Sequence, residues 1–279
     1  MSIHHSEWLH EAKSLAIGRQ ARVYHGSERR PNLVVYNNHD SWSCYCHSCH
    51  EGAFIPKELV KPLPETVEAI AKGMPITEEI TSKTVDIELI ADYAHKSGVS
   101  IVDLMQWGFK YEPKLRRLLY ISPVGSPYVV MGRALTRSNM KWYRYGGLGG
   151  YVSLGNINAS NVYLTEDILS AHKLYDTLRR MVVRDKVYFD NFAVVCCLGT
   201  TMCTPLLIAL LEAKSVVIAL DGDTAGRNAT LDFKRTLALY NIPHTVLEVP
   251  DGLDPKHLNY DALYERILNV SKHYVSQGL

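Results

Sequence analysis

From residue 161 onward, short apolar runs alternate with stretches of helical spacing, and this alternation restricts the fold more than any other feature of the 279-residue chain. The apolar runs predict strands at 162–164, 192–198, 215–220 and 244–249, and the intervening stretches predict helices at 170–181, 204–213 and 225–240. Such an alternation, with nearly continuous apolar strands, predicts a mainly parallel sheet covered by helices on both faces. The second half of the chain is therefore expected to have an α/β fold.

Acidic residues come after the predicted strands. Glu166 and Asp167 come directly after the first strand, Asp221 and Asp223 after the third, and Asp254 after the fourth. Ligands of open α/β sheets bind outside the carboxyl ends of the strands, so these side chains are expected to lie close together at that edge. Clustered carboxylates repel one another unless cations neutralise them, and hard oxygen ligands favour Mg²⁺ or Mn²⁺. The sequence predicts a divalent-metal site there.

The chemistry suited to such a site is phosphoryl transfer, in which paired metals stabilise the attacking and leaving oxygens. Asp221 and Asp223 are two residues apart, a spacing that can place both carboxylates on the same side, and Gly222 leaves room for backbone or phosphate to approach. Glu166 is expected to act as a general base or to assist in metal binding. An isolated Asp-Gly-Asp more often forms a turn or surface loop, so the longer context decides between the two interpretations.

That context is the string VVIALDGDTAGRNAT, with VYLTE upstream and GLDP downstream. It resembles the Toprim domain of primases, topoisomerases and related nucleases. In that family a Glu after the first strand and the two Asp of a DxD motif bind the catalytic metals. The resemblance implies these roles for Glu166, Asp221 and Asp223, with Asp254 at a further acidic position. The family usually has Gly after the Glu, where this chain has Asp167.

The first 60 residues contain a second candidate metal site. Cys46 and Cys49 form a CxxC pair, whose turn lets two thiolates reach one tetrahedral Zn²⁺. His25 has the right place to be a third ligand, but a partner three residues earlier would be Arg22, which cannot bind metal. Cys44 is the best candidate for the fourth ligand. The alternatives are His39, His47 and His50.

The pattern W-x-x-Y-C-x-x-C-x-x-G in this segment resembles the zinc-binding domain of bacterial and phage primases. That family typically has four zinc ligands. The resemblance therefore implies one Zn²⁺ bound by His25, Cys44, Cys46 and Cys49.

Between the two metal sites lies a locally basic block with mixed structure. Helical spacing at 86–98 and 100–109 predicts two helices. Alternating segments at 115–124 and 126–137, around a Gly-Ser-Pro turn, predict paired strands. Because the net charge is only +1, contacts with phosphate must come from local patches, and basic residues interleaved with aromatics suit single-stranded nucleic acid. A solvated sheet face is the competing interpretation. In primases this block faces template and nucleotides, which implies those roles for Arg133, Arg137 and Lys141.

The order of the parts is a further indication of function. We expect α+β and α/β structure divided into a zinc-binding module at 1–60, a linker at 61–83, a basic α+β half at 84–160 and a Toprim half at 161–279. Bacterial and phage primases have this order. The resemblance implies a DNA primase that makes short RNA primers by metal-dependent nucleotidyl transfer. Its implied partners are a single-stranded DNA template, ribonucleoside triphosphates and a replicative helicase.

Two other functions remain open at this point. One is a Toprim-type nuclease, and the other is a non-catalytic, zinc-stabilised protein that binds single-stranded DNA or recruits a helicase. The start of the chain lacks the pattern of a signal peptide, and no apolar run approaches the ~20 residues that span a bilayer. A cytoplasmic protein without membrane contact is expected, in the host cytoplasm if its origin is a phage.

Overall fold

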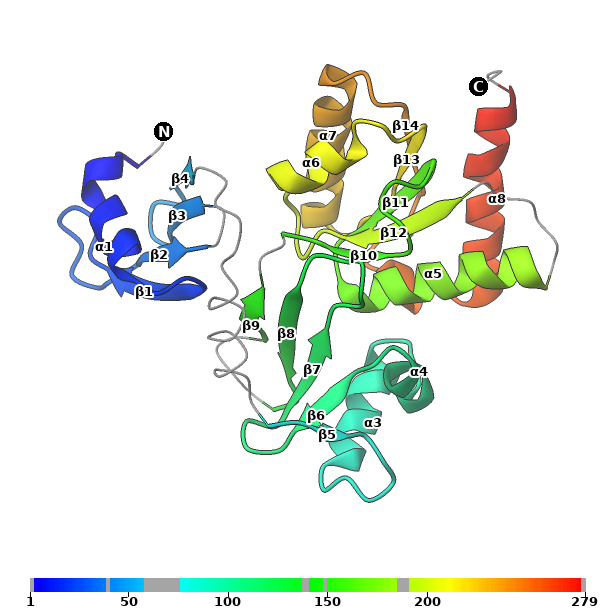
Figure 1. Ribbon diagram of the computed structural model, residues 1–279, viewed down its shortest axis with the longest axis horizontal. Coiled ribbons are helices and arrows are strands. Elements are labelled where there is room, and N and C mark those ends of the chain that lie inside the picture. Colours follow the sequence, from blue (N-terminus) through cyan, green and yellow to red (C-terminus); the bar gives the residue numbers. More distant parts are fainter. Residues whose placement is uncertain are drawn as a thin grey trace. The chain divides into compact units, whose positions relative to one another are not determined.

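A computed structural model describes residues 3–38, 41–57, 76–136, 141–147, 150–184 and 191–276. The chain divides into two compact units (Figure 1): Met1–Pro75 with Tyr143–Leu148, and Ile76–Trp142 with Gly149–Leu279. Most of the linker predicted at 61–83 lies outside the described residues. None of the helices in the described ranges combines the length and apolar character that crossing a bilayer requires.

The first unit is a small antiparallel sheet packed against a short helix. The strands come one after another in the order β1 (Arg19–Val23), β2 (Leu33–Asn37), β3 (Ser41–Cys46) and β4 (Gly52–Pro56), preceded by η1 (His5–Glu7) and α1 (Leu9–Ser14). Its core joins residues of the helix segment to β2 and β3, and includes Trp8, Leu33, Val35, Cys44 and Cys46. So few buried residues give the sheet little stability of its own.

The second unit begins with an antiparallel sheet. Its strands run in the order β5 (Glu78–Glu79), β6 (Lys110–Glu112), β7 (Arg117–Ile121) and β8 (Val129–Ala134), and α3 (Ile87–Lys96) and α4 (Ile101–Gln106) separate β5 from β6. Strand β9 (Trp142–Gly147) belongs to the first unit except for Trp142. The two helices and the β7–β8 pair occur where the sequence predicts them. Ser100 starts α4 with a capping box, because its hydroxyl accepts from the Asp103 N–H and the Asp103 carboxylate accepts from the Ser100 N–H.

The remaining sheet confirms the predicted α/β fold. Its order is β10-β12-β11-β13-β14, and β11, β12, β13 and β14 are parallel whereas the edge strand β10 is antiparallel. The strands are β10 (Val152–Leu154), β11 (Asn161–Thr165), β12 (Phe192–Cys196), β13 (Ser215–Ile218) and β14 (His244–Val246). The helices are α5 (Ile168–Val183), α6 (Thr204–Leu210), α7 (Thr224–Leu239) and α8 (Tyr260–Ser276), with the short turn η2 (Pro255–His257) before α8.

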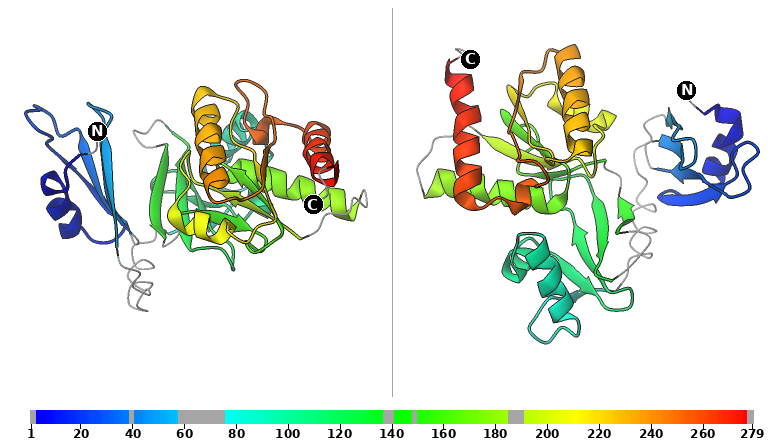
Figure 2. Two further views of the ribbon diagram at one scale, coloured as in Figure 1. Left: turned by 90° about the horizontal axis from the view of Figure 1, so that it is seen from above. Right: turned by 180° about the vertical axis from the view of Figure 1, so that it is seen from behind.

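Helices cover both faces of this sheet, α6 and α7 on one side and α5 and α8 on the other (Figures 1 and 2). The alternation along β11 explains why both faces are apolar: Val162 and Leu164 pack with α6 and α7, whereas Tyr163 packs in the other core. That other core also contains Leu118 and Val129 of the antiparallel sheet. The antiparallel and parallel sheets of the second unit therefore share one hydrophobic core.

A buried histidine lies inside this shared core. His172 on α5 is 8% exposed, its Nε2 lies 2.9 Å from the Tyr120 hydroxyl, and its ring stacks on Trp107 with centroids 5.0 Å apart. The Trp107 Nε1 in turn donates to Asp176, at 2.7 Å. Burial lowers the pKa of His172 to about 3, so the imidazole is neutral in the folded protein at neutral pH.

Acid should destabilise the second unit through His172. Below about pH 6.5 the unfolded chain binds a proton at this residue, while the folded protein stays neutral until about pH 3, so stability falls as the pH falls between these values. Between pH 6.5 and 4.5 the loss due to His172 is about 2 to 3 kcal/mol. Urea unfolding at both pH values should show this loss in the wild type and not in His172→Gln, which keeps an acceptor for Tyr120. If the unfolding free energies of the wild type and of His172→Gln depended equally on pH, the conclusion that His172 is neutral in the folded protein would be contradicted.

Candidate active site and metal centres

Acidic side chains gather at the carboxyl edge of the parallel sheet. Carboxylate oxygens of Asp167, Asp221 and Asp254 lie within 4.8 Å of one another. These residues come after β11, β13 and β14, so parallel strands bring together positions that are far apart in sequence. The structure thus places Asp221 and Asp254 together as the sequence predicts. It adds Asp167, which the sequence did not single out as a metal ligand.

Glu166 and Asp223 flank this group. The Asp223 carboxylate caps α7 by accepting from the Gly226 N–H at 2.7 Å, so one of its oxygens has a structural role. Burial and the nearby carboxylates of Asp223, Asp167 and Asp254 raise the pKa of Glu166. The sequence predicted both residues as metal ligands, and both lie close enough to the group to share its electrostatic field.

The cluster has the properties of a cation site. Burial, and after it repulsion from Asp167, Asp254 and Glu166, raises the pKa of Asp221 to about 8. Glu166 Oε2 and Asp221 Oδ1 are buried and accept no hydrogen bond within the described part of the chain. Buried carboxylate oxygens without a partner are costly, and a hard divalent cation would satisfy them. The residues present therefore fit Mg²⁺ or Mn²⁺.

One lysine already neutralises part of this charge. Lys256 on η2 lies with its Nζ 3.0 Å from Asp167 Oδ2 and also donates to Asp254, and its side chain is 14% exposed. Burial alone would lower the pKa of Lys256, but the two carboxylates more than offset burial and hold the pKa above its ordinary value. A permanent positive charge thus stands inside the carboxylate cluster.

Two glycines allow the loop after β13 to fold tightly. A Cβ on Gly222 would lie 2.1 Å from the Pro250 carbonyl oxygen, and a Cβ on Gly226 would lie 2.1 Å from the Asp221 carbonyl oxygen. The room predicted at Gly222 is therefore filled by the neighbouring loop. Arg227 closes the same loop by donating to the Gly222 carbonyl and to Asp251.

A cavity of about 480 Å³ opens onto the carboxylates, a size in the range of small-molecule sites. Glu166, Asp221 and Lys256 line it together with Arg133 and Lys141 of the antiparallel half. The structure thus brings two of the three predicted phosphate-binding residues to the acidic cluster. The third, Arg137, lies outside the described residues.

Arg133 is held in this cavity by aromatic rings. Its guanidinium lies 5.2 Å from the ring centre of Tyr93 and 5.7 Å from that of Trp142. Its Nε is buried and donates no hydrogen bond to any described residue. A buried donor without an acceptor, opposite buried acceptors without donors, indicates a polar ligand between them. By contrast Arg116, from the same basic block, forms an ion pair with Asp86, its Nη2 2.5 Å from Oδ1.

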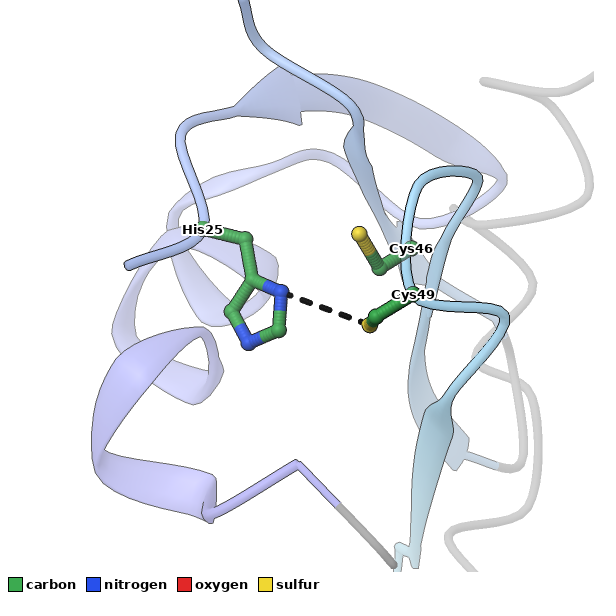
Figure 3. Close-up of side chains that lie close together, drawn as sticks. All are labelled: His25, Cys46 and Cys49. Atoms are coloured by element: carbon green, nitrogen blue, oxygen red, sulfur yellow. Dashed lines mark hydrogen bonds between the residues drawn. The ribbon is translucent and has the colours of Figure 1, made fainter. Parts of the chain in front are cut away.

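The first unit holds three of the four predicted zinc ligands together. Ligand atoms of His25, Cys46 and Cys49 lie within 4.8 Å of one another, and the His25 Nδ1 is 3.6 Å from the Cys49 Sγ (Figure 3). Thiolates and imidazoles are the donors of structural zinc sites, which have four ligands, so these residues fit three of the four positions around Zn²⁺. Cys44 lies outside this group, in the core of the unit, where burial raises its pKa to about 11.

The three alternative histidines do not join the group either. His47 and His50 lie beside Tyr45, with ring centroids of His47 and Tyr45 5.2 Å apart and His50 Nδ1 3.3 Å from the Tyr45 hydroxyl. His39 lies outside the described residues. Among the described histidines and cysteines, the structure assigns no fourth ligand to this group.

A known protein family matches the part of the chain that contains the acidic site. Residues 166–258, which include every carboxylate of the cluster, match the family model described as Toprim-like. This stretch is a Toprim-like domain. It covers about a third of the chain, and no curated protein sequence matches the chain.

Solved structures extend the likeness beyond the Toprim-like domain. The zinc-binding and RNA polymerase domains of the Aquifex aeolicus primase match with a TM-score of 0.53 and 15% identity, over 90% of this chain and 78% of that one. The RNA polymerase domain of the Mycobacterium tuberculosis primase DnaG matches with a TM-score of 0.52 and 15% identity, over 72% and 81% of the two chains. The chain therefore has a primase-like fold.

The structure gives two residues of the Toprim-like domain roles that sequence reasoning did not assign. Asp167, expected at this edge but given no role there, accepts from the Leu169 and Ser170 N–H groups and so starts α5, and it also binds Lys256. The signal for its capping role was an acidic residue three positions before the helix predicted at 170–181. Lys256 comes one residue after the GLDP motif, and nothing in its sequence neighbourhood indicates that it points into the cluster.

We expect Lys256→Met to destabilise the Toprim-like domain more strongly without divalent metal than with it. Removal of the ammonium leaves Asp167 and Asp254 facing each other unneutralised, and breaking a buried ion pair costs about 3 kcal/mol or more. Added Mg²⁺ should restore part of this loss. Thermal unfolding of the variant in EDTA and in Mg²⁺ measures this loss of stability. The control is Lys214→Met, which replaces an exposed lysine of the same unit. An identical loss in both buffers would contradict the expectation.

Proposed function

We propose that this protein is a DNA primase, which synthesises short RNA primers on single-stranded DNA by metal-dependent nucleotidyl transfer. The observation that carries the proposal is the cavity in which the carboxylates of the Toprim-like domain face Arg133 and Lys141. Acidic groups for metal and basic groups for phosphate, in one cavity, are the parts that phosphoryl transfer requires.

The acidic wall would hold the metal. Glu166, Asp221, Asp223 and Asp254 are the proposed ligands of Mg²⁺ or Mn²⁺, and the unpartnered oxygens of Glu166 and Asp221 support this assignment. When bound, the metal supplies positive charge to the attacking and leaving oxygens of the transferred phosphoryl group. Lys256 keeps Asp167 and Asp254 in place whether or not metal is bound.

The basic wall would bind nucleotide and template. Arg133 and Lys141 would contact the phosphates of a ribonucleoside triphosphate or of the DNA strand, because both line the cavity and carry charge opposite to phosphate. Trp142 and Tyr93 support the Arg133 guanidinium from its faces, which orients its donors. Arg137 is proposed for the same role from its position in the sequence.

The rest of the chain supports the same function. A cluster of His25, Cys46 and Cys49 precedes the Toprim-like domain, and the Aquifex aeolicus primase, whose zinc-binding and RNA polymerase domains have a similar fold, contains both kinds of domain. Zn²⁺ bound by the first unit and Mg²⁺ bound by the second are the two proposed cofactors. The proposed substrates are a single-stranded DNA template and ribonucleoside triphosphates.

A template-directed synthesis assay tests the proposal. We expect short RNA products from single-stranded DNA and labelled ribonucleoside triphosphates in Mg²⁺, with a composition complementary to the template. Cleavage of the DNA without nucleotide incorporation would instead indicate the Toprim-type nuclease. Binding of single-stranded DNA without either reaction would indicate the non-catalytic alternative.

A replicative helicase is the proposed partner. A chain near neutrality should hold DNA weakly at physiological salt and gain effective concentration from a tethering partner. Titrating the cognate helicase into a priming reaction on long single-stranded DNA should increase primer yield. No increase, together with no complex in a pull-down, would contradict this partner.

A further inference from the structure

The first unit contains an acidic residue beside one of the zinc ligands. Glu28 Oε1 lies 3.6 Å from the Cys46 Sγ, and Glu28 Oε2 is buried. Burial alone would raise the pKa of Glu28, but the side chains of Ser48, Asn32 and Cys46 interact with the carboxylate and lower it. We infer that Glu28 is the fourth ligand of the zinc site, together with His25, Cys46 and Cys49, and that Cys44 is not a ligand.

Two of the separations agree with a tetrahedral site. The Glu28 carboxylate is not within 4.8 Å of all three of the other ligand atoms, so its side chain would turn toward His25 and Cys49 to complete the site. Zinc bonds of about 2.3 Å to sulfur and about 2.0 to 2.2 Å to nitrogen or oxygen, at tetrahedral angles, separate neighbouring ligand atoms by about 3.6 Å. The separations from Cys49 Sγ to His25 Nδ1 and from Cys46 Sγ to Glu28 Oε1 are both 3.6 Å. Each cysteine thus has one further donor at the separation that a shared zinc ion requires.

Cys44 lies outside the group that His25, Cys46 and Cys49 form, and its place on the strand separates it from Cys46. Cys44 and Cys46 are two residues apart on strand β3, so their side chains share a face but are displaced along the strand by about 6.6 Å. Two thiolates on one tetrahedral zinc are only about 3.8 Å apart. Cys44 pairs across the sheet with Val35 and Ala53 and is 5% exposed, as a core residue.

The other nearby carboxylate lies on the wrong side of the imidazole. Glu7 Oε2 is 3.6 Å from His25 Nε2, whereas the thiol of Cys49 faces Nδ1. A metal bound at Nδ1 leaves Nε2 protonated and directed at Glu7. Carboxylates in this position orient a zinc-binding histidine without touching the metal. Glu7 is therefore a positioning residue, and Glu28 remains as the ligand.

The spacing explains why the sequence left the fourth ligand open. Zinc ligands come in pairs separated by two to four residues, and the position three residues upstream of His25 holds Arg22, which cannot bind metal. Glu28 is the same distance downstream. The two pairs are then His25-x-x-Glu28, which comes before strand β2 in the sequence, and Cys46-x-x-Cys49, which comes after it.

The test replaces zinc by Co²⁺ in the full-length protein and compares variants. Thiolate-to-cobalt charge-transfer absorption reports the number of sulfur ligands, and visible bands report tetrahedral coordination. We expect two sulfurs in the wild type and in Cys44→Ser, and a third in Glu28→Cys. Glu28→Gln should weaken zinc binding at least ~100-fold in competition with a chelator, more than loss of an outer partner such as Glu7.

X-ray absorption of the zinc protein provides a second readout that does not depend on a variant folding. Two sulfur and two nitrogen or oxygen neighbours are expected, whereas three sulfurs would show Cys44 to be the ligand and overturn the inference. Loss of binding in Cys44→Ser with full binding in Glu28→Gln would overturn it as well. A purified chain that holds no zinc and takes up no Co²⁺ would do the same.

Discussion

Primer synthesis should fall at least ~100-fold when Asp221 or Asp223 is replaced by Ala, while binding of single-stranded DNA stays close to the wild-type level. In the proposed function, the carboxylates would hold the metal that stabilises transition-state charge, whereas template affinity would come mainly from basic residues, of which Arg133 and Lys141 line the cavity. The two proposed roles belong to different residues of one cavity and should therefore separate by mutation.

Substitution by Asn makes this experiment sharper. Asp223 caps α7, so Asp223→Ala loses both a metal ligand and a helix cap, the latter worth about 1 kcal/mol. Asn caps a helix as well as Asp does, so Asp223→Asn removes the charge and keeps the cap. The matched control is Asp251→Asn, because the Asp251 carboxylate is 93% exposed and pairs with Arg227 outside the cluster. Near wild-type primer yield in Asp221→Asn and Asp223→Asn would refute the metal assignment.

Combined replacement of Cys46 and Cys49 by Ser should abolish zinc binding and unfold the first unit while the second stays folded. The first unit buries few large side chains, among them Trp8 and Leu33, and so is expected to depend on metal for its stability. Structural zinc contributes roughly 10 to 16 kcal/mol of apparent binding free energy to such small units. The free energy lost with the ion should therefore be larger than the folding free energy of the sheet by itself.

Hydrogen exchange read out by peptide resolves the two units in one experiment. Amides of β2 and β3 should lose protection in the double variant, and in wild type treated with a strong chelator, while amides of β11 and β13 keep theirs. Cys203→Ser in the second unit is the control for cysteine replacement as such. About one zinc per chain should be present before treatment. Elemental analysis that finds none, or full protection after its removal, would contradict the expectation.

The parallel sheet could be predicted because strand and helix differ in the spacing of their apolar residues. The runs around Val194 and Val217 are apolar on both faces, and only a sheet covered on both sides buries them. The acidic edge could be predicted by the same inference, since parallel strands place the residues after their carboxyl ends at one edge of the sheet. Neither step needed more than the order of residues along the chain.

The contacts that could not be predicted from the sequence are those whose existence depends on how side chains are placed in three dimensions. Lys256 enters the carboxylate cluster from a turn about ninety residues after Asp167, and no local pattern marks it. Cys44 looks like a zinc ligand next to Cys46 until strand β3 fixes their displacement along the strand. In both cases the deciding information is a distance between atoms, which spacing in the sequence does not contain.

The hydrophobic core shared by the two halves of the second unit limits how the cavity can move. Arg133 belongs to strand β8 and Glu166 comes after strand β11, and residues of both sheets pack into that one core. Swinging one half away from the other would expose closely packed apolar surface, so such an opening is a rare event close to global unfolding. In the proposed function, nucleotides would therefore enter and leave by rearrangement of side chains and loops at the rim. The two walls would meet each new substrate at an essentially fixed separation.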